Sequence, residues 1–121
     1  MRIAITRKVS PAMAKCELTH LARSPIDVRR AAEQHDRYEQ CLRGLGCEVQ
    51  SLTAEPELPD SVFVEDAALV LDEIAVITRP GAESRRAETE SLARRMREAG
   101  FTNVTWRGIT LGVAAIHVGE A

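Results

Sequence analysis

The sequence predicts a protein of the α/β class, and three observations carry this prediction. Patterns typical of strands and of helices alternate along the 121 residues. Two stretches follow the same order of strand, loop, helix, glycine and strand, which indicates a repeated module of about 50–60 residues. Apolar residues make up 45% and charged residues 28% of the chain, as in an average soluble protein. We therefore expect a single domain over residues 1–121.

The first module begins with a strand at residues 2–7, where polar and apolar residues alternate. Residues 8–26 show no period and contain two Ser-Pro pairs, so they predict a long loop. Asp27 is suited to cap a helix that ends before Gly46, and residues 48–52 predict a short strand. The helix face that we expect to be buried consists of Val28, Ala31, Ala32, His35, Tyr38, Cys41, Leu42 and Leu45.

The second module follows a loop at residues 53–60 that contains two prolines. Residues 62–64 are apolar and are expected to be extended. Two strands are predicted at residues 67–71 and 74–77, joined by a tight hairpin at residues 72–73.

A second helix is predicted to begin at Ser84 and to end at Gly100, with Leu92, Met96 and Ala99 turned inward. One strand is expected to start at residue 104, and another to cover residues 109–118.

Composition excludes several classes of protein. The net charge is −2, with 16 basic and 18 acidic residues, which argues against a nucleic-acid binder. The longest apolar run is far shorter than the ~20 residues that a membrane helix needs. The three cysteines are odd in number and match no zinc spacing, and the strand pattern at the N-terminus leaves no room for a targeting peptide. We therefore expect a cytoplasmic protein without a membrane, nucleic-acid or metal partner.

The most informative segment for chemistry is residues 58–66, which places three carboxylates around a short apolar stretch. If this stretch is extended, Asp60 and Asp66 share one side, with Glu65 next to Asp66. Two carboxylates beside a hydrophobic wall suit a planar guanidinium, which binds carboxylates through paired hydrogen bonds. The alternative is a surface loop with ordinary solvated acids.

Other candidate groups are less specific. The arginines of residues 77–86 lie near a predicted helix start and could bind a carboxylate, or could simply be exposed on a capped helix. His20, His35 and His117 have no acid or cysteine at a spacing that indicates a catalytic triad. The sequence context does not mark Cys16 as an activated nucleophile.

Four segments, taken in their order, resemble a known family. These are residues 2–7 (RIAITR), 16–20 (CELTH), 58–66 (LPDSVFVED) and 75–81 (AVITRPG). They are similar to the N-terminal half of the dimethylarginine dimethylaminohydrolases, which belong to the guanidino-group-modifying superfamily with the pentein fold. The resemblance covers about residues 2–98.

The resemblance implies a fold and an activity. The family fold is an α/β propeller, so this chain would be a partial, pentein-like propeller with about two ββαβ-type modules. The family hydrolyses methylated arginine to citrulline and a methylamine with a cysteine nucleophile and a histidine, and uses no cofactor or metal. Asp60 and Asp66 match positions that hold the substrate, and Glu65 belongs to the same motif. Arg85 matches a position that binds the amino-acid end of the substrate, and Leu18 matches a residue of the loop that closes over the site.

The sequence also departs from the family pattern. Members are about twice as long, and their nucleophilic cysteine and catalytic histidine have no counterpart here, so we assign no catalytic residue. The family's acidic double-glycine motif is also absent, since residues 110–119 read TLGVAAIHVG. We therefore expect either a truncated protein of this type that holds substrate-binding elements, or a non-catalytic binding or assembly module. Such a half-propeller could form a homo-oligomer or pair with a second chain, because it would expose strand edges. An unrelated α/β domain is the third alternative.

Overall fold

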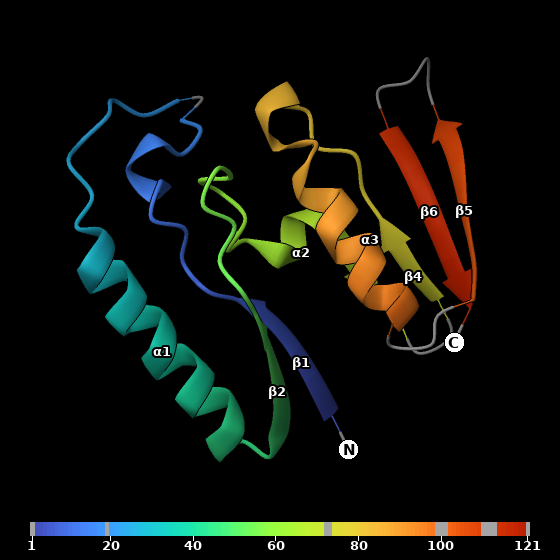
Figure 1. The fold of residues 1–121 in the computed structure, drawn as a ribbon, viewed down its shortest axis with the longest axis horizontal. Helices are drawn as coiled ribbons and strands as arrows, with labels where there is room; N and C mark the ends of the chain where they lie inside the picture. Colours follow the sequence, from blue (N-terminus) through green and yellow to red (C-terminus); the bar gives the residue numbers. More distant parts are fainter. Residues whose placement is uncertain (1, 19, 72–73, 99–101, 110–113, 121) are drawn as a thin grey trace. The chain divides into compact units, whose positions relative to one another are not determined.

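The computed structural model describes residues 2–18, 20–71, 74–98, 102–109 and 114–120. The chain divides into two compact units, Met1–Val62 and Phe63–Ala121. Both units combine helices with a sheet (Figure 1), which confirms the α/β class. The expectation of a single domain stays a prediction. Within the described residues, no helix has the length and apolar character needed to cross a membrane.

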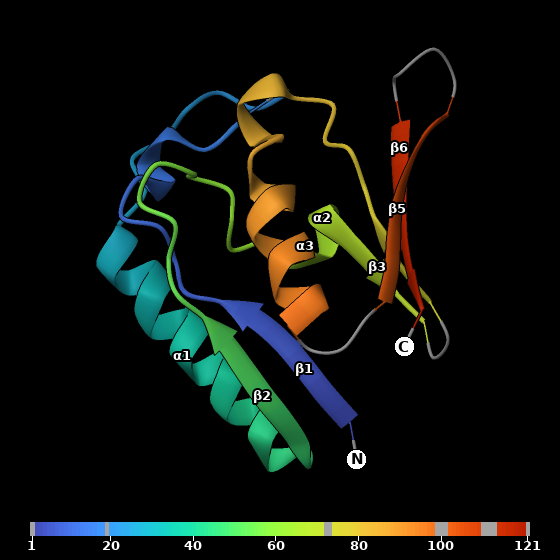
Figure 2. The same ribbon diagram turned by 45° about the vertical axis from the view of Figure 1, so that its right-hand side comes forward.

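The first unit is a strand–helix–strand motif. Strands β1 (Arg2–Arg7) and β2 (Cys47–Leu52) pair in parallel, and helix α1 (Val28–Gly44) connects them. Both strands and the helix lie where the sequence predicts them, and the described residues of the long loop include the short 3-10 helix η1 (Met13–Lys15). Figure 2 shows α1 lying along this pair of strands.

The ends of α1 follow their local sequence. The Asp27 carboxylate accepts a hydrogen bond from the Arg30 N–H at 3.0 Å, as expected of a helix cap. Gly46 follows the helix with a φ of +83°, a conformation that glycine adopts without strain. The cap and the glycine therefore fix where α1 begins and where the chain turns into β2.

The buried face of α1 differs from the prediction. Tyr38 and Leu45 are 54% and 79% exposed, and Cys41 is exposed as well. Glu39, a charged residue, is instead buried. The prediction is wrong for the three exposed residues, whereas the other predicted residues are half-buried: Val28, Ala31, Ala32, His35 and Leu42. It also missed Glu39, whose burial depends on hydroxyl groups that the two strands donate to its carboxylate.

The second unit contains an antiparallel sheet with strand order β3-β4-β6-β5. Its elements are the helices α2 (Val64–Ala67) and α3 (Glu88–Glu98), the 3-10 helix η2 (Glu83–Arg85) and the strands β3 (Ala68–Val70), β4 (Ile74–Ile77), β5 (Thr102–Ile109) and β6 (Ala114–Glu120). Figures 1 and 2 show α3 along one face of this sheet. Among the residues of this unit whose burial is described, the buried apolar ones are Ala67, Ala75, Ile77, Leu92 and Ala93.

Two local predictions for residues 62–88 are wrong. Residues 62–64 are not an extended segment, because a turn leads directly into α2 at Val64. The second long helix starts at Glu88 and not at Ser84, since residues 83–85 form the separate 3-10 turn η2. The predicted hairpin at residues 72–73 and the inward placement of Met96 and Ala99 lie outside what the structure describes.

Candidate functional site

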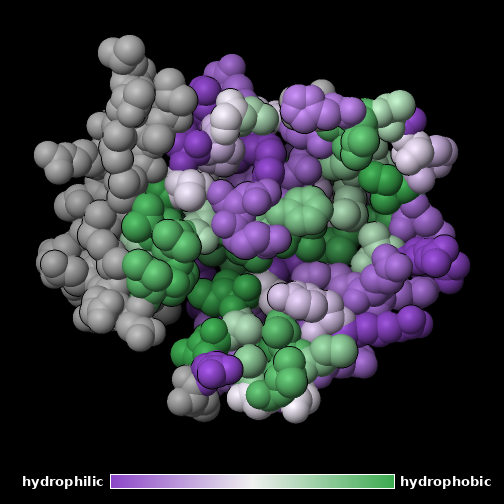
Figure 3. Space-filling view, turned by 180° about the vertical axis from the view of Figure 1, so that it is seen from behind, coloured by the Kyte–Doolittle hydropathy of each residue, from purple (hydrophilic) through white to green (hydrophobic). Residues whose placement is uncertain are grey.

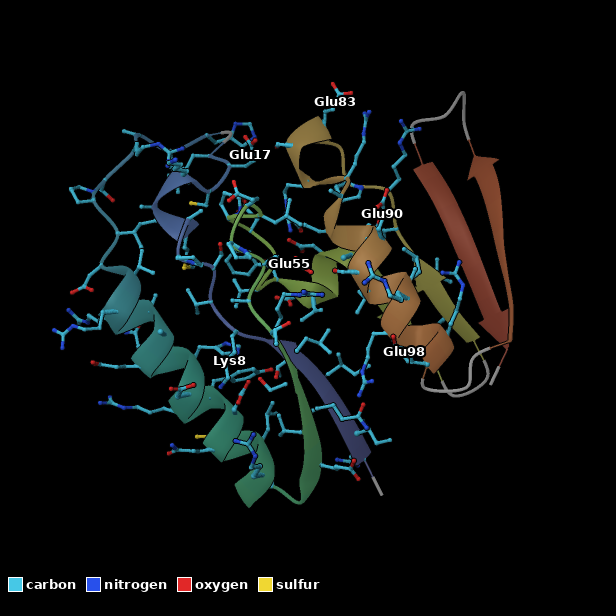
Figure 4. The ribbon with its side chains drawn as sticks, in the orientation of Figure 1. Lys8, Glu17, Glu55, Glu83, Glu90 and Glu98 are labelled. Carbon is cyan, nitrogen blue, oxygen red and sulfur yellow. The ribbon has the colours of Figure 1, made fainter. Side chains whose placement is uncertain are left out.

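Asp60 is the buried carboxylate of the candidate site and belongs to the first unit. It lies in a turn after the two prolines and is 5% exposed. Its Oδ2 accepts a hydrogen bond from the backbone N–H of Glu17 at 3.0 Å. Leu18, the next residue, is half-buried. Asp60 therefore fixes the loop that carries Leu18, so these two predicted residues are linked through Glu17, which is labelled in Figure 4.

The same loop is held by further polar contacts. The Arg23 guanidinium donates to the carbonyl oxygens of Ala14 and Cys16, both at 2.7 Å. The hydroxyl of Ser10, a fully buried residue, donates to the carbonyl oxygen of Glu55 at 2.8 Å. Side-chain bonds to the backbone thus give a defined conformation to a loop in which η1 is a short 3-10 helix.

Glu65 and Asp66 belong to the second unit, on α2. Both side chains are exposed. The carbonyl oxygen of Asp66 accepts from the Thr78 hydroxyl at 2.6 Å, and the Thr78 N–H donates to the carbonyl oxygen of Ala67 at 3.0 Å. These bonds connect α2 to the segment that follows β4 and fix the position of the Asp66 backbone.

Arg85 lies close to Asp66 although 19 positions separate them in sequence. Arg85 Nη1 donates to Asp66 Oδ2 at 2.9 Å. On its other side, Arg85 donates through Nε to Glu88 Oε1 at 3.1 Å and through Nη2 to Glu88 Oε2 at 3.0 Å. Such a paired contact between a guanidinium and a carboxylate is geometrically specific. The structure therefore brings Asp66 and Arg85 together and adds Glu88, which the sequence reasoning did not single out.

The sequence suggested that Asp60 and Asp66 share one side of an extended stretch, but the structure does not place them on one. A turn contains Asp60, and the helix α2 contains Asp66. The two carboxylates belong to different compact units. Alternation along a strand therefore does not bring Asp60 and Asp66 to one side, and only the family resemblance points to both as ligand-binding residues.

Glu39 is a second buried carboxylate that sequence reasoning missed. Its Oε1 accepts from the hydroxyls of Ser51 at 2.6 Å and of Thr6 at 2.8 Å, two residues that are partners in the register of β1 and β2. Its Oε2 accepts from Lys8 Nζ at 3.0 Å and from Arg43 Nη2 at 3.3 Å. Glu39 lies four residues after His35, which the sequence predicts to lie on the buried face of α1. This spacing was the sequence signal that could have revealed the burial of Glu39.

These contacts determine the protonation of Glu39. Burial acts to raise its pKa, but hydrogen bonds from Ser51, Thr6 and Lys8 outweigh burial and lower the pKa to about 2. The pKa of Lys8 is raised, first by its hydrogen bond with Asp36 and then by that with Glu39. Lys8 is labelled in Figure 4 beside α1. The ion cluster attaches α1 to the pair of strands β1 and β2, and its members are Lys8, Asp36, Glu39 and Arg43.

His35 lies beside this cluster. Its Nε2 is 3.3 Å from Glu39 Oε1, yet the two atoms do not have the geometry of a hydrogen bond. Such a poorly aligned contact contributes little to stability. The His35 side chain is 12% exposed, so His35 is a largely buried histidine of the first unit.

The cysteines carry free thiols. Cys16 is buried, Cys47 is half-buried and Cys41 is exposed. Among the described residues, no three His, Cys, Asp or Glu side chains are grouped as a metal site requires. His117 belongs to β6, where only the backbone is described.

Comparison with known proteins identifies relatives. No family model matches the chain. A dimethylarginine dimethylaminohydrolase from Streptomyces coelicolor is 40% identical over 119 residues, which cover 97% of this chain and 46% of that protein. The corresponding protein from Pseudomonas aeruginosa is 48% identical over 64 residues, or 53% of this chain and 25% of that protein.

Solved structures agree with the sequence relatives. A dimethylarginine dimethylaminohydrolase variant in adduct with S-methyl-L-thiocitrulline matches with a TM-score of 0.75 and 36% identity, covering 82% of this chain and 39% of that one. A variant of the Pseudomonas aeruginosa enzyme complexed with citrulline matches with a TM-score of 0.74 and 35% identity over the same shares of the two chains. By sequence and by fold, this chain is therefore homologous to the dimethylarginine dimethylaminohydrolase family, and it spans about half the length of the first relative it matches.

Proposed function

We propose that this chain is a dimethylargininase-type protein that binds an arginine-like guanidino ligand. Hydrolases of this type convert methylated arginine and water to citrulline and a methylamine. The observation that carries the proposal is the 40% identity over 97% of the chain to a dimethylarginine dimethylaminohydrolase. Solved relatives bind citrulline or S-methyl-L-thiocitrulline, which supports a ligand of the same size and shape.

The proposed binding residues are Leu18 and Asp60 of the first unit and Glu65, Asp66 and Arg85 of the second. Asp66 is an exposed carboxylate on a fixed backbone, which suits it to accept hydrogen bonds from a guanidinium. Arg85 is a guanidinium of restricted orientation, which suits it to bind the carboxylate of an amino acid. The proposal assigns no nucleophile within this chain, so we expect binding without turnover.

Calorimetric titration of the purified chain with asymmetric dimethylarginine tests this proposal, with citrulline assayed in the same samples. Asp66→Ala should abolish binding. Asp36→Ala is a matched control, because the Asp36 side chain is 56% exposed, compared with 52% for Asp66, and is also ion-paired. Citrulline formation would show that the chain contains its own nucleophile. A folded chain that binds no dimethylarginine would contradict the proposed function.

A second candidate function is an assembly module, and one observation favours it. Strand β3 forms an edge of the described sheet, and Leu69, Val70 and Leu71 are 52–56% exposed. In Figure 3, hydrophobic residues gather in patches on the face that Figure 1 turns away from the viewer. Exposed apolar edge strands favour pairing with another chain. Light scattering after size-exclusion chromatography measures this directly, and a strictly monomeric chain would argue against the assembly module.

A further inference from the structure

Arg85 is held by two carboxylates that differ in their exposure to solvent. The Asp66 side chain is 52% exposed and contacts Arg85 through one ion pair at 2.9 Å. The Glu88 side chain is 3% exposed and accepts from both Nε and Nη2 of Arg85. Water can replace Arg85 at Asp66, whereas separating Arg85 from Glu88 would leave a buried charge without its partner.

This difference matters if a ligand guanidinium binds at Asp66, as the proposed function requires. A ligand guanidinium that pairs with both oxygens of the Asp66 carboxylate must then compete with Arg85 Nη1 at Oδ2. Once that contact is exchanged, Arg85 would lose one restraint on its orientation. Glu88 contacts the opposite edge of the guanidinium, so its two hydrogen bonds remain when Asp66 turns to the ligand.

The position of Glu88 is itself fixed. It is the first residue of α3, where a negative charge is favoured by the helix dipole. Its carbonyl oxygen accepts from the Ser91 hydroxyl at 3.3 Å. Arg85 lies three residues earlier, at the end of η2, so one short segment carries both partners. A rigid acceptor on a helix start is suited to orient a neighbouring arginine.

We propose that Glu88 is a positioning residue, which keeps the Arg85 guanidinium oriented for the ligand carboxylate while Asp66 exchanges Arg85 for the ligand guanidinium. This inference rests on the proposed function. Glu88 does not touch the ligand. It determines whether the protein recognises the carboxylate end of an arginine-like molecule, and thus whether it distinguishes an amino acid from the corresponding decarboxylated amine.

Arginine and agmatine are the probes that test this role, because agmatine carries the guanidinium but lacks the carboxylate. Their affinities are measured by calorimetry for the wild type, Glu88→Gln and the control Glu90→Gln. Glu90 is an exposed acid on the same helix, labelled in Figure 4, so its replacement changes the charge equally. We expect Glu88→Gln to weaken arginine binding by roughly tenfold or more and to leave agmatine binding within about twofold. Glu90→Gln should retain the wild-type preference for arginine.

The outcomes separate this inference from the proposed function. If the wild type prefers arginine and Glu88→Gln keeps the same preference, Glu88 is not a positioning residue and the binding function stands. If the folded wild type binds neither ligand, both ideas are overturned. Nuclear magnetic resonance of the wild-type protein tests the orientation of Arg85 without a ligand. Its result does not depend on whether Glu88→Gln folds. In the wild type, the Arg85 Nε–H should exchange slowly with solvent, and fast exchange would contradict the fixed orientation.

Discussion

Glu39 allows a quantitative prediction about the stability of the first unit. Its carboxylate has a pKa of about 2, compared with an ordinary value of 4.5. At about 1.4 kcal/mol per pKa unit, the ionised form contributes about 3 kcal/mol to the free energy of unfolding. Because the folded pKa is the lower one, this contribution is present above pH 4.5 and is lost as the pH falls towards 2.

Glu39→Gln removes the charge and keeps the shape of the side chain. The amide oxygen can still accept from the hydroxyls of Thr6 and Ser51, but the amide nitrogen would face the donors of Lys8 and Arg43. We therefore expect a loss of about 2 kcal/mol of the free energy of unfolding at pH 7. Urea unfolding followed by circular dichroism measures this loss, and hydrogen exchange of the α1 amides assigns it to unit 1.

The pH dependence is the sharper part of this test. The difference in stability between wild type and Glu39→Gln should narrow as the pH falls from 4.5 towards 2, because protonation neutralises Glu39 in the wild type. Glu33→Gln, on the exposed side of the same helix, should show almost no effect at any pH. A difference that stays constant between pH 7 and pH 2.5 would refute the role assigned to the Glu39 charge.

The loop, two glycines and the thiols can be tested in the same way. Arg23→Ala removes two hydrogen bonds to the carbonyl oxygens of the loop, so amide exchange just after η1 should accelerate while α1 exchange is unchanged. Gly46→Ala should lower the free energy of unfolding by about 1 kcal/mol, because φ is +83°. Gly44→Ala, within α1 and in open space, should raise it by about 0.5–1 kcal/mol. Equal effects of the two substitutions in urea unfolding would contradict this. A thiol reagent should modify Cys41 well before Cys16, and mass spectrometry of the modified peptides would show the reverse order if the burial is wrong.

Local sequence signals predicted the elements that depend on local interactions. Strand β1 follows its alternation of polar and apolar residues, and α1 begins after its Asp27 cap and ends before Gly46. Residues 62–64 were misread because a short apolar run does not distinguish a strand from a turn that leads into a helix. The start of α3 was misplaced because Ser84 forms part of a 3-10 turn, which one capping signal does not reveal.

The polar clusters depend on contacts between distant residues, so the sequence alone could not supply them. The Glu39 carboxylate is satisfied by Thr6, 33 positions away, and by Ser51, 12 positions away. The ion pair of Asp66 with Arg85 spans 19 positions. The contact between Arg85 and Glu88 is different, since a spacing of three residues near a helix start is a pattern that sequence reasoning could have found.

The proposed function requires that carboxylates of this chain recognise a guanidinium. Citrulline is a close neutral analogue of arginine, so comparing it with asymmetric dimethylarginine isolates the contribution of the ligand's charge. We predict that the wild-type chain binds asymmetric dimethylarginine at least about tenfold more tightly than citrulline, and that Asp66→Asn removes most of this preference. Equal affinities of the wild-type chain for the two ligands, or a preference that Asp66→Asn leaves intact, would contradict the account.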